Sequence, residues 1–411
     1  MLTGLLMGAG ASYELGMPLV WDLTAQLRQW LTPEKLWQLN VSWRSRGGGY
    51  PDRIIADFVP LLVRPDLHYE SLLGHLETQY RRASHLRQHY HSLYQWLVDI
   101  VYHILYLRHI RGEPVILAAM RFFDGLAGLA EQSKPLWVFS LNHDVLIECI
   151  AVRHGIHVCS GFQDGIIELP RRDRAGTEVG RLRAEVMTGS RFEKTGLLFL
   201  RRGSPGINLL KIHGSLDVFA FKDGKDLLKL LPMDSSVEGV IASLRAANEE
   251  LLYVDSARPN EPVKVTNEIA YADDSGEMQF LRRSLLAGMF KFDRSASQVL
   301  PIRLLDSFRT NVNHVTHLAC VGYGFGDIHI NQILRGWLEF TAQRRLEIVA
   351  PGAKDIPQCL LHLAPQVMLT SSTTTDYLAQ FAATPLSEEE RIAKDSWNLL
   401  REAQRKDKGY A

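Results

Sequence analysis

Five short apolar runs, separated by segments of helical character, constrain the fold of this 411-residue chain more than any other feature. The runs are Leu2 to Met7, Leu136 to Leu141, Leu209 to Ile212, His317 to Gly322 and Leu346 to Ala350. Short apolar strands that alternate with helices are typical of an α/β fold with a parallel sheet. The sequence therefore predicts a Rossmann-like parallel sheet, in which ligands bind where the carboxyl ends of the strands meet.

A long stretch of helical periodicity, at about 19–131, separates the first two runs. Its apolar residues recur three and four positions apart, as at Leu72, Leu73 and Leu76, which is the spacing of amphipathic helices. A glycine-rich segment at 47–49 predicts a loop inside this stretch. We therefore expect a large helical insertion in the α/β core.

Two shorter insertions are expected at about 162–206 and 219–275, and neither resembles a separate domain. The first has an excess of basic residues and several strand-like runs, whereas the second combines a small helix with turns. Residues 1–351 should therefore form one domain. Residues 352–411 are predicted to add a C-terminal strand and a helical tail, which has three glutamates at 388–390 in the first turn of its helix.

Charge and cysteine content exclude several classes of protein. The 46 basic residues balance the 46 acidic ones, so direct binding to nucleic acid is not expected and the basic insertion is interpreted as solvated. The four cysteines are far apart and form no CxxC pair, which argues against a zinc module and a disulfide framework. No apolar run approaches the roughly 20 residues that span a bilayer. Because the first run is interpreted as a core strand and not a removable leader, we expect a cytoplasmic protein.

A glycine turn follows the first apolar run directly, at Gly8, Ala9, Gly10 and Ser12. Glycines at such a turn let a diphosphate approach the backbone, and the N–H groups at the start of a helix attract its charge. Turns of this kind also occur for packing reasons alone. Taken by itself, the segment therefore indicates a nucleotide site without establishing one.

Polar or glycine residues also end three other runs. Ser140, Asn142 and Asp144 stand at the end of the second run, and His213 follows the third. The loop after the fourth run contains Gly322, Tyr323 and Gly324. Each polar residue alone is usually a helix cap or a satisfied core group. Their coincidence at the same edge of the predicted sheet indicates one common site.

Together and in this order, the four segments resemble the sirtuin family. The Gly-Ala-Gly-Ala-Ser segment, followed by Gly16, Met17 and Pro18, is similar to the family's Gly-Ala-Gly-x-Ser and Gly-Ile-Pro pieces. The Asn-x-Asp at 142–144 and the His-Gly-Ser at 213–215 match two further family motifs. The segments HYESLLGHLE and GYGFGD are typical of the compact sirtuin-like NADases of bacterial antiphage defence. The resemblance extends over residues 1–351.

Departures from the family concern the binding of peptide substrates. Leu19, Val20 and Trp21 replace the Asp-Phe-Arg of sirtuin deacylases, and the four-cysteine zinc module is missing. Leu141 replaces the glutamine of the Thr-Gln-Asn signature, and the Gly-Thr-Ser loop is Gly-Tyr-Gly here. The resemblance therefore implies an NAD⁺ hydrolase that needs no metal. A protein deacylase and a non-catalytic ADP-ribose or nucleotide sensor are the alternatives.

The resemblance also implies a role for each site residue. Asp144 would hold the nicotinamide carboxamide, Asn142 would orient a ribose hydroxyl or water, and His213 would act as general base. NAD⁺ would lie against Gly8, Ala9, Gly10, Ser12, Met17, Pro18, Ser140, Gly322, Tyr323 and Gly324. The products would be nicotinamide and ADP-ribose.

Regulation by a partner is expected, because an enzyme that freely hydrolysed a central cofactor would kill its host. We expect a homo-oligomer, and the compact members of the family imply a HerA-type hexameric ATPase as partner. Trp96, Tyr102 and Tyr106 form an aromatic stripe on the helical insertion that could bury against another subunit, although packing inside the chain is the favoured interpretation.

Overall fold

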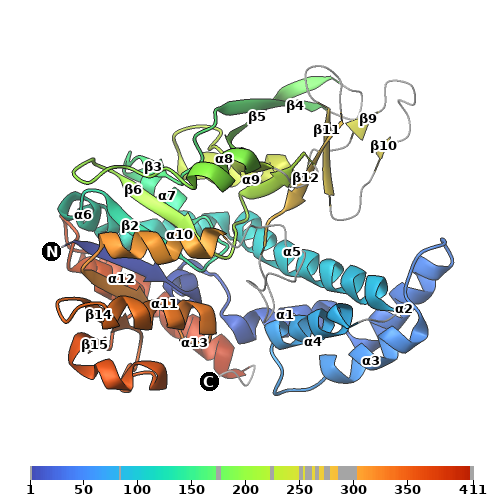
Figure 1. Cartoon of the computed structure of the whole chain (residues 1–411), viewed down its shortest axis with the longest axis horizontal. Coiled ribbons are helices and arrows are strands. Elements are labelled where there is room, and N and C mark those ends of the chain that lie inside the picture. The colour runs from blue at the N-terminus through green and yellow to red at the C-terminus, as the bar shows by residue number, and fades with distance from the viewer. Residues whose placement is uncertain are drawn as a thin grey trace.

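A seven-stranded parallel sheet forms the centre of the molecule in the computed structural model (Figure 1), which describes residues 2–82, 85–172, 177–222, 226–249, 253–254, 262–263, 268–272, 278–285 and 303–407. The strand order is β15-β14-β13-β1-β2-β6-β3. The bounds are β1 Thr3–Met7, β2 Leu136–Ser140, β3 Val158–Cys159, β6 Ile207–Lys211, β13 His317–Val321, β14 Arg345–Val349 and β15 Val367–Thr370. The predicted fold class is therefore confirmed, and the five apolar runs match five strands to within two residues.

Helices cover both faces of this sheet. Alternate strand residues point to opposite faces, so Leu6, Phe139 and Cys320 pack with α10 (Arg303–Asn311) and α11 (Ile328–Glu339). On the other face, Leu5, Val138 and Leu209 pack against helices that include α5 (Arg87–Ala119), α6 (Gly125–Gln132), α7 (Leu146–Arg153) and α12 (Thr374–Ala379). Burial on both faces explains why the strands are continuously apolar in the sequence.

The helical insertion is present where the periodicity predicted it. It comprises α1 (Val20–Trp30), α2 (Pro33–Arg44), α3 (Asp52–Leu62), α4 (Tyr69–Arg81), the 33-residue α5, the short η2 (Met120–Phe123) and α6. Helices α1 to α4 lie to one side of the sheet, and α5 runs from this group toward the core (Figure 1).

The aromatic stripe of α5 packs within the chain, which is the interpretation that the sequence analysis favoured over an interface. Tyr102 is fully buried, and its hydroxyl donates to the Leu216 carbonyl at 3.1 Å. Tyr106 is also buried, and the half-buried Trp96 makes an edge contact with Trp43 at 4.9 Å between ring centroids. A central helix that is packed on several sides needs a wide apolar surface. In the sequence, such a surface looks the same as one that contacts another subunit.

The two shorter insertions join in one antiparallel sheet of order β11-β12-β7-β8-β5-β4. Its strands are β4 Ile166–Arg172, β5 Glu178–Met187, β7 Val218–Phe221, β8 Asp226–Leu230, β11 Glu268–Ala272 and β12 Met278–Arg283. The short helices α8 (Gly189–Thr195) and α9 (Val237–Glu249) accompany it, and β9 (Tyr253–Val254) pairs with β10 (Pro262–Val263). The sequence did not predict that the insertions pair, and parts of the insertion at 219–275 lie outside the described residues.

The C-terminal residues are part of the core. The predicted strand is β15, which pairs with β14, and the predicted helical tail is α13 (Glu388–Asp407). Trp397 of α13 donates its indole N–H to the Glu14 carbonyl at 2.9 Å, and the Arg401 guanidinium donates to the Met17 carbonyl at 2.9 Å. The tail therefore fastens the segment that follows β1.

The structure also shows the state of the cysteines and the character of the helices. All four cysteines are free thiols, and Cys149, Cys159 and Cys320 are buried. Among the helices that the structure describes, none has the length and apolar character needed to cross a membrane.

Candidate functional site

The strand order brings the four sequence segments to one edge of the sheet. Strands β13, β1, β2 and β6 are consecutive neighbours, and Met7 at the end of β1 pairs with both Val321 and Ser140. Ser140 in turn pairs with Lys211 at the end of β6. From β1 the chain proceeds to β2 on one side and returns as β13 on the other, so the strand order reverses here. In open parallel sheets this reversal point is where ligands bind.

The glycines of the first turn serve close packing between two loops. Gly8 donates its N–H to the Val321 carbonyl at 3.0 Å, and Gly10 donates to the Gly322 carbonyl at 2.9 Å. A Cβ atom on Gly10 would lie 2.8 Å from the Gly322 Cα, and one on Gly322, whose φ is +61°, would lie 2.3 Å from the Ala11 nitrogen. These three glycines are therefore required by packing, and contact with a ligand remains a prediction for them.

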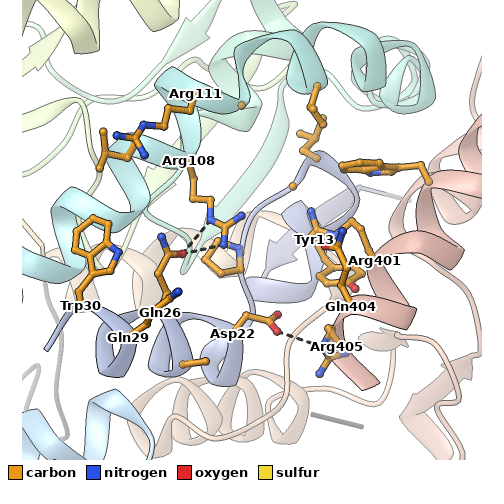
Figure 2. A pocket seen from close by; sticks show the side chains of 18 residues that line it. Tyr13, Asp22, Gln26, Gln29, Trp30, Arg108, Arg111, Arg401, Gln404 and Arg405 are labelled. Atoms are coloured by element: carbon orange, nitrogen blue, oxygen red, sulfur yellow. Dashed lines mark hydrogen bonds and ion pairs between the residues drawn. The ribbon is translucent and has the colours of Figure 1, made fainter. Parts of the chain in front are cut away.

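A 3₁₀ helix, η1 (Ala9–Leu15), follows the turn, and α1 begins only at Val20. Two predicted cofactor residues that follow Ser12 in the chain, Met17 and Pro18, lie in a different region from Ser12. Pro18 lines a cavity of about 650 Å³ together with Tyr13 and Gly16 (Figure 2), and Met17 is buried beside it. Asn142, Asp144 and His213 do not line this cavity. The η1 segment thus faces two different regions.

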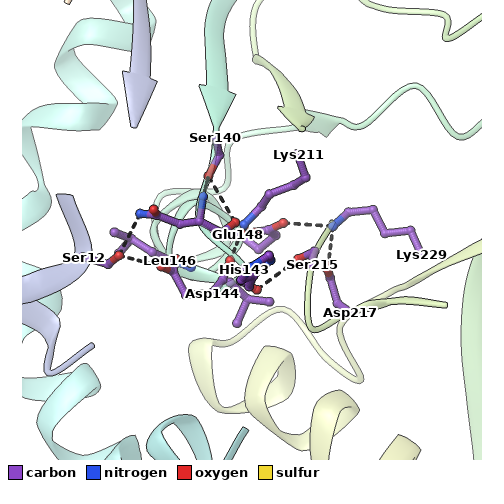
Figure 3. Close-up of polar contacts among 12 residues, drawn as sticks. Ser12, Ser140, His143, Asp144, Leu146, Glu148, Lys211, Ser215, Asp217 and Lys229 are labelled. Carbon is purple, nitrogen blue, oxygen red and sulfur yellow. Dashed lines mark hydrogen bonds and ion pairs between the residues drawn. The ribbon is translucent and has the colours of Figure 1, made fainter. Parts of the chain in front are cut away.

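Asn142, Ser12 and Asp144 form a buried hydrogen-bonded network (Figure 3). The Asn142 side-chain amide donates to the Gly8 carbonyl at 2.8 Å and to the Ser12 Oγ at 2.9 Å. The Ser12 hydroxyl donates to the Asp144 Oδ2 at 2.5 Å. Ser140 accepts the Asn142 backbone N–H at its Oγ, at 3.1 Å. The structure therefore brings together four of the predicted site residues and fixes their orientation.

His213 lies beside this network and pairs with a carboxylate that the sequence analysis did not select. Its Nε2 is 3.2 Å from the Asp327 Oδ2, and both side chains are mostly buried. Asp327 also caps α11, because its Oδ1 accepts the His329 and Ile330 N–H groups at 3.0 and 3.2 Å. A carboxylate at this distance stabilises a protonated imidazole electrostatically. The available sequence feature was an aspartate directly before a helix, which is also the ordinary position of a cap.

Backbone hydrogen bonds join the loops that carry these groups. The Ile212 N–H donates to the Ser140 carbonyl and the Leu216 N–H to the His143 carbonyl, each at 2.9 Å. The segments that follow β2 and β6 therefore run side by side. Asn142 and His213 stand at corresponding positions, two residues beyond the paired Ser140 and Lys211.

The loop after β13 has an open side. A Cβ atom on Gly324 or Gly326 would meet nothing within 4 Å, and both residues are exposed. Tyr323 is buried, and its hydroxyl donates to the Asn331 Oδ1 at 2.9 Å. The Asn331 amide donates to the Phe325 carbonyl at 2.7 Å, and Phe325 has a φ of +56°. Such a φ is strained for a bulky residue and persists only where its surroundings impose it. A ligand could approach this loop closely at its two exposed glycines.

Two buried lysines and two buried acids extend the network toward the second sheet (Figure 3). Lys211 donates to the Asp144 backbone carbonyl and lies 3.7 Å from Glu148. Lys229 of β8 lies 2.9 Å from Glu148 and also pairs with Asp217.

The pKa values of this pair reflect a balance between burial and charge. Burial alone would lower the pKa of Lys229, but Asp217 and Glu148 raise it well above its ordinary value. Burial would likewise raise the pKa of Asp217, but Lys229 and Lys211 hold it below its ordinary value. Both groups are therefore charged at neutral pH. This ionic cluster anchors the second sheet to the strand ends that carry Asp144 and His213, and no local sequence pattern indicated it.

Comparison with known proteins does not identify a family for this chain. No family model matches the chain, and no curated protein matches it. A solved structure described as the crystal structure of a Sir2 homolog–NAD complex is similar over 96% of this chain and 90% of its own, at 12% identity and a TM-score of 0.38. A likeness this weak does not bear on function. Among the described residues, no group of three or more His, Cys, Asp or Glu side chains could hold a metal ion.

Proposed function

We propose that the chain is an NAD⁺ glycohydrolase that cleaves the bond between nicotinamide and ribose. The observation that supports this proposal best is the convergence of Asn142, Asp144 and His213 at the ends of adjacent strands, beside the glycine turn after β1. The family that the sequence resembles uses these residue types to bind and cleave NAD⁺. The substrate would be NAD⁺, and the products would be nicotinamide and ADP-ribose.

The reaction requires positioning more than acid catalysis. Nicotinamide leaves with the electron pair of the broken C–N bond, which neutralises its positive ring, so no proton donor is needed. Water attacks the ribose carbon, whose transition state resembles an oxocarbenium ion, and loses a proton to a base. His213 would be that base, oriented by Asp327, while Asn142 would orient a ribose hydroxyl or the water and Asp144 the carboxamide.

A biological role follows from this chemistry as part of the proposal. Depletion of NAD⁺ during phage infection would stop the host's metabolism, and such an activity needs a gate. The proposed gate is assembly as a homo-oligomer with a HerA-type hexameric ATPase, supported by the sequence resemblance alone. The aromatic stripe of α5 gives no support, because Tyr102 and Tyr106 are buried within the chain.

A single incubation separates the proposal from its alternatives. Purified protein is incubated with NAD⁺, with and without an acetylated peptide and with and without the candidate ATPase, and the products are separated by chromatography. We expect equal amounts of nicotinamide and ADP-ribose, independent of the peptide. Release that requires the peptide would favour a deacylase. Binding of NAD⁺ without release under any of these conditions would favour a sensor.

A further inference from the structure

The cavity on the other region of η1 has a lining suited to an anion (Figure 2). It lies between α1, α5 and α13, and its volume of about 650 Å³ is in the range of small-molecule sites. We call it the arginine cavity, because its lining includes Arg108, Arg111, Arg401 and Arg405. Among the described residues that line it, Asp22 is the only acidic one.

The arginines of this cavity are held mainly by neutral groups. Arg108 donates to the Gln26 Oε1 at 2.8 and 3.2 Å. Arg401 donates to the Met17 carbonyl, and its guanidinium lies 4.1 Å from the centre of the Tyr13 ring. Asp22 lies 3.5 Å from Arg405 and so neutralises one of the four cations. The lining therefore keeps a positive excess that an anion could neutralise.

Partial burial of two of these arginines also favours the binding of an anion. Burial lowers the pKa of both Arg108 and Arg401, because partial removal from water disfavours their charged forms. Guanidinium groups nevertheless stay protonated in proteins. A phosphate group would provide the charge and the paired acceptor oxygens that these forks match.

The cavity also offers a face for a planar ring. Trp30 lines it, with 36% of the residue exposed. Figure 2 shows Arg108 between Trp30 and Arg111 on one side and Arg401 and Arg405 on the other. We infer that the arginine cavity binds a nucleotide, with its phosphates against Arg108, Arg111 and Arg401 and its base against Trp30. This site is separate from the candidate catalytic site. Ser12 and Tyr13 are adjacent residues of η1, but Ser12 belongs to the catalytic network and Tyr13 lines the arginine cavity.

Titration calorimetry of the full chain with ATP, tripolyphosphate and adenosine tests this inference without relying on turnover. We expect ATP and tripolyphosphate to bind and adenosine to bind weakly. The double variant with Arg108→Gln and Arg111→Gln should bind ATP at least about tenfold more weakly, because charged hydrogen bonds are lost. Trp30→Ala should weaken ATP binding but leave tripolyphosphate binding unchanged. Arg335→Gln, on the exposed face of α11, is the matched control and should bind ATP normally.

Three outcomes would overturn the inference. ATP binding that survives the double arginine replacement would place the nucleotide elsewhere. An equal loss in the Arg335→Gln control would mean a general charge effect. Loss of ATP binding in Asn142→Ala would place ATP in the catalytic region. Failure of NAD⁺ cleavage would leave this result unaffected, since the measurement is binding.

Discussion

The candidate catalytic site and the arginine cavity lie against the same short segment but are built in opposite ways. In the catalytic site, Ser12, Asn142 and Asp144 are buried and bonded to one another, on loops that follow adjacent strands. In the arginine cavity, the charged groups are partly exposed, carry a positive excess and come from three helices far apart in the sequence. The first region is fixed by strand order, whereas the second exists only because α13 docks beside α1 and α5. Substitutions should therefore affect both stability and turnover in the first region, and mainly binding in the second.

The largest effect is expected from Asn142→Ala and His213→Ala. Loss of the proposed base or of the orienting amide should reduce nicotinamide release at least about 100-fold. Asn142→Ala should also cost about 1–3 kcal/mol of stability, because it removes the side-chain amide that donates to the Gly8 carbonyl and to the Ser12 hydroxyl in a buried network. Turnover and thermal denaturation measured on the same samples separate the two effects. Near wild-type turnover in either variant would remove that residue from the proposed mechanism.

The next largest effect is expected in the ionic cluster. Lys229→Met leaves Asp217 and Glu148 buried with Lys211 as their remaining neighbouring cation and should cost about 3–5 kcal/mol in chemical denaturation. The control is Arg335→Gln, which breaks a surface pair with Glu339 and should cost at most about 1 kcal/mol. Similar losses in the two variants would mean that the cluster does not anchor the second sheet.

The same variant should reverse the pH dependence of the cluster. In the wild type the pKa of Asp217 is depressed, so its contribution is present above about pH 4 and is lost as pH falls through the folded pKa. In Lys229→Met the two buried carboxylates share Lys211 alone, so at least one of them should have a raised pKa, and stability is lost as pH rises through it. The variant should therefore be closer to wild type at pH 5 than at pH 8. Equal losses at both pH values would contradict this account.

Packing between the two glycine loops should be less costly to disturb. Gly322→Ala places a Cβ atom 2.3 Å from the Ala11 nitrogen at a φ of +61° and should lower the free energy of unfolding by at least about 2 kcal/mol. Gly324→Ala, which meets nothing within 4 Å, should stay within about 0.5 kcal/mol of wild type. Weaker NAD⁺ binding in the Gly324 variant alone would support ligand approach at this loop. Equal stability of the two variants would exclude the packing explanation.

Asp327→Asn tests the positioning of the imidazole. Asparagine can still cap α11, so the helix and the melting temperature should be retained. Because the charge that orients His213 is lost, kcat should fall about tenfold while KM for NAD⁺ stays unchanged. A variant that loses stability and turnover together would show that Asp327 acts only as a cap.

The smallest effect on stability is expected from a substitution in the arginine cavity. Arg111 is exposed on α5, so Arg111→Gln should change the free energy of unfolding by less than about 0.5 kcal/mol. Differential scanning calorimetry can measure this difference. A larger loss would indicate that the cavity arginines stabilise the docking of helices and are not reserved for a ligand.

The sequence by itself determined the elements that local patterns encode. Continuous apolar runs predicted the five central strands, because a strand buried on both faces has no polar side. The three-and-four spacing predicted helices such as α4, and the acidic first turn predicted the start of α13. Since the strands are parallel, their carboxyl ends share an edge, and this is why the sequence predicts that Asn142, Asp144 and His213 lie in one region.

Only the tertiary structure decided which distant segments meet. Strand pairing between the two insertions, the Asp327 partner of His213 and the Lys229 cluster all depend on contacts between residues far apart in the chain, which leave no periodic trace in the sequence. The same limit explains the burial of Tyr102, because an apolar stripe looks alike whether its partner belongs to the same chain or to another. The sequence did not reveal the arginine cavity for this reason. Its four arginines come from α5 and α13, which become neighbours only when the tail docks on η1.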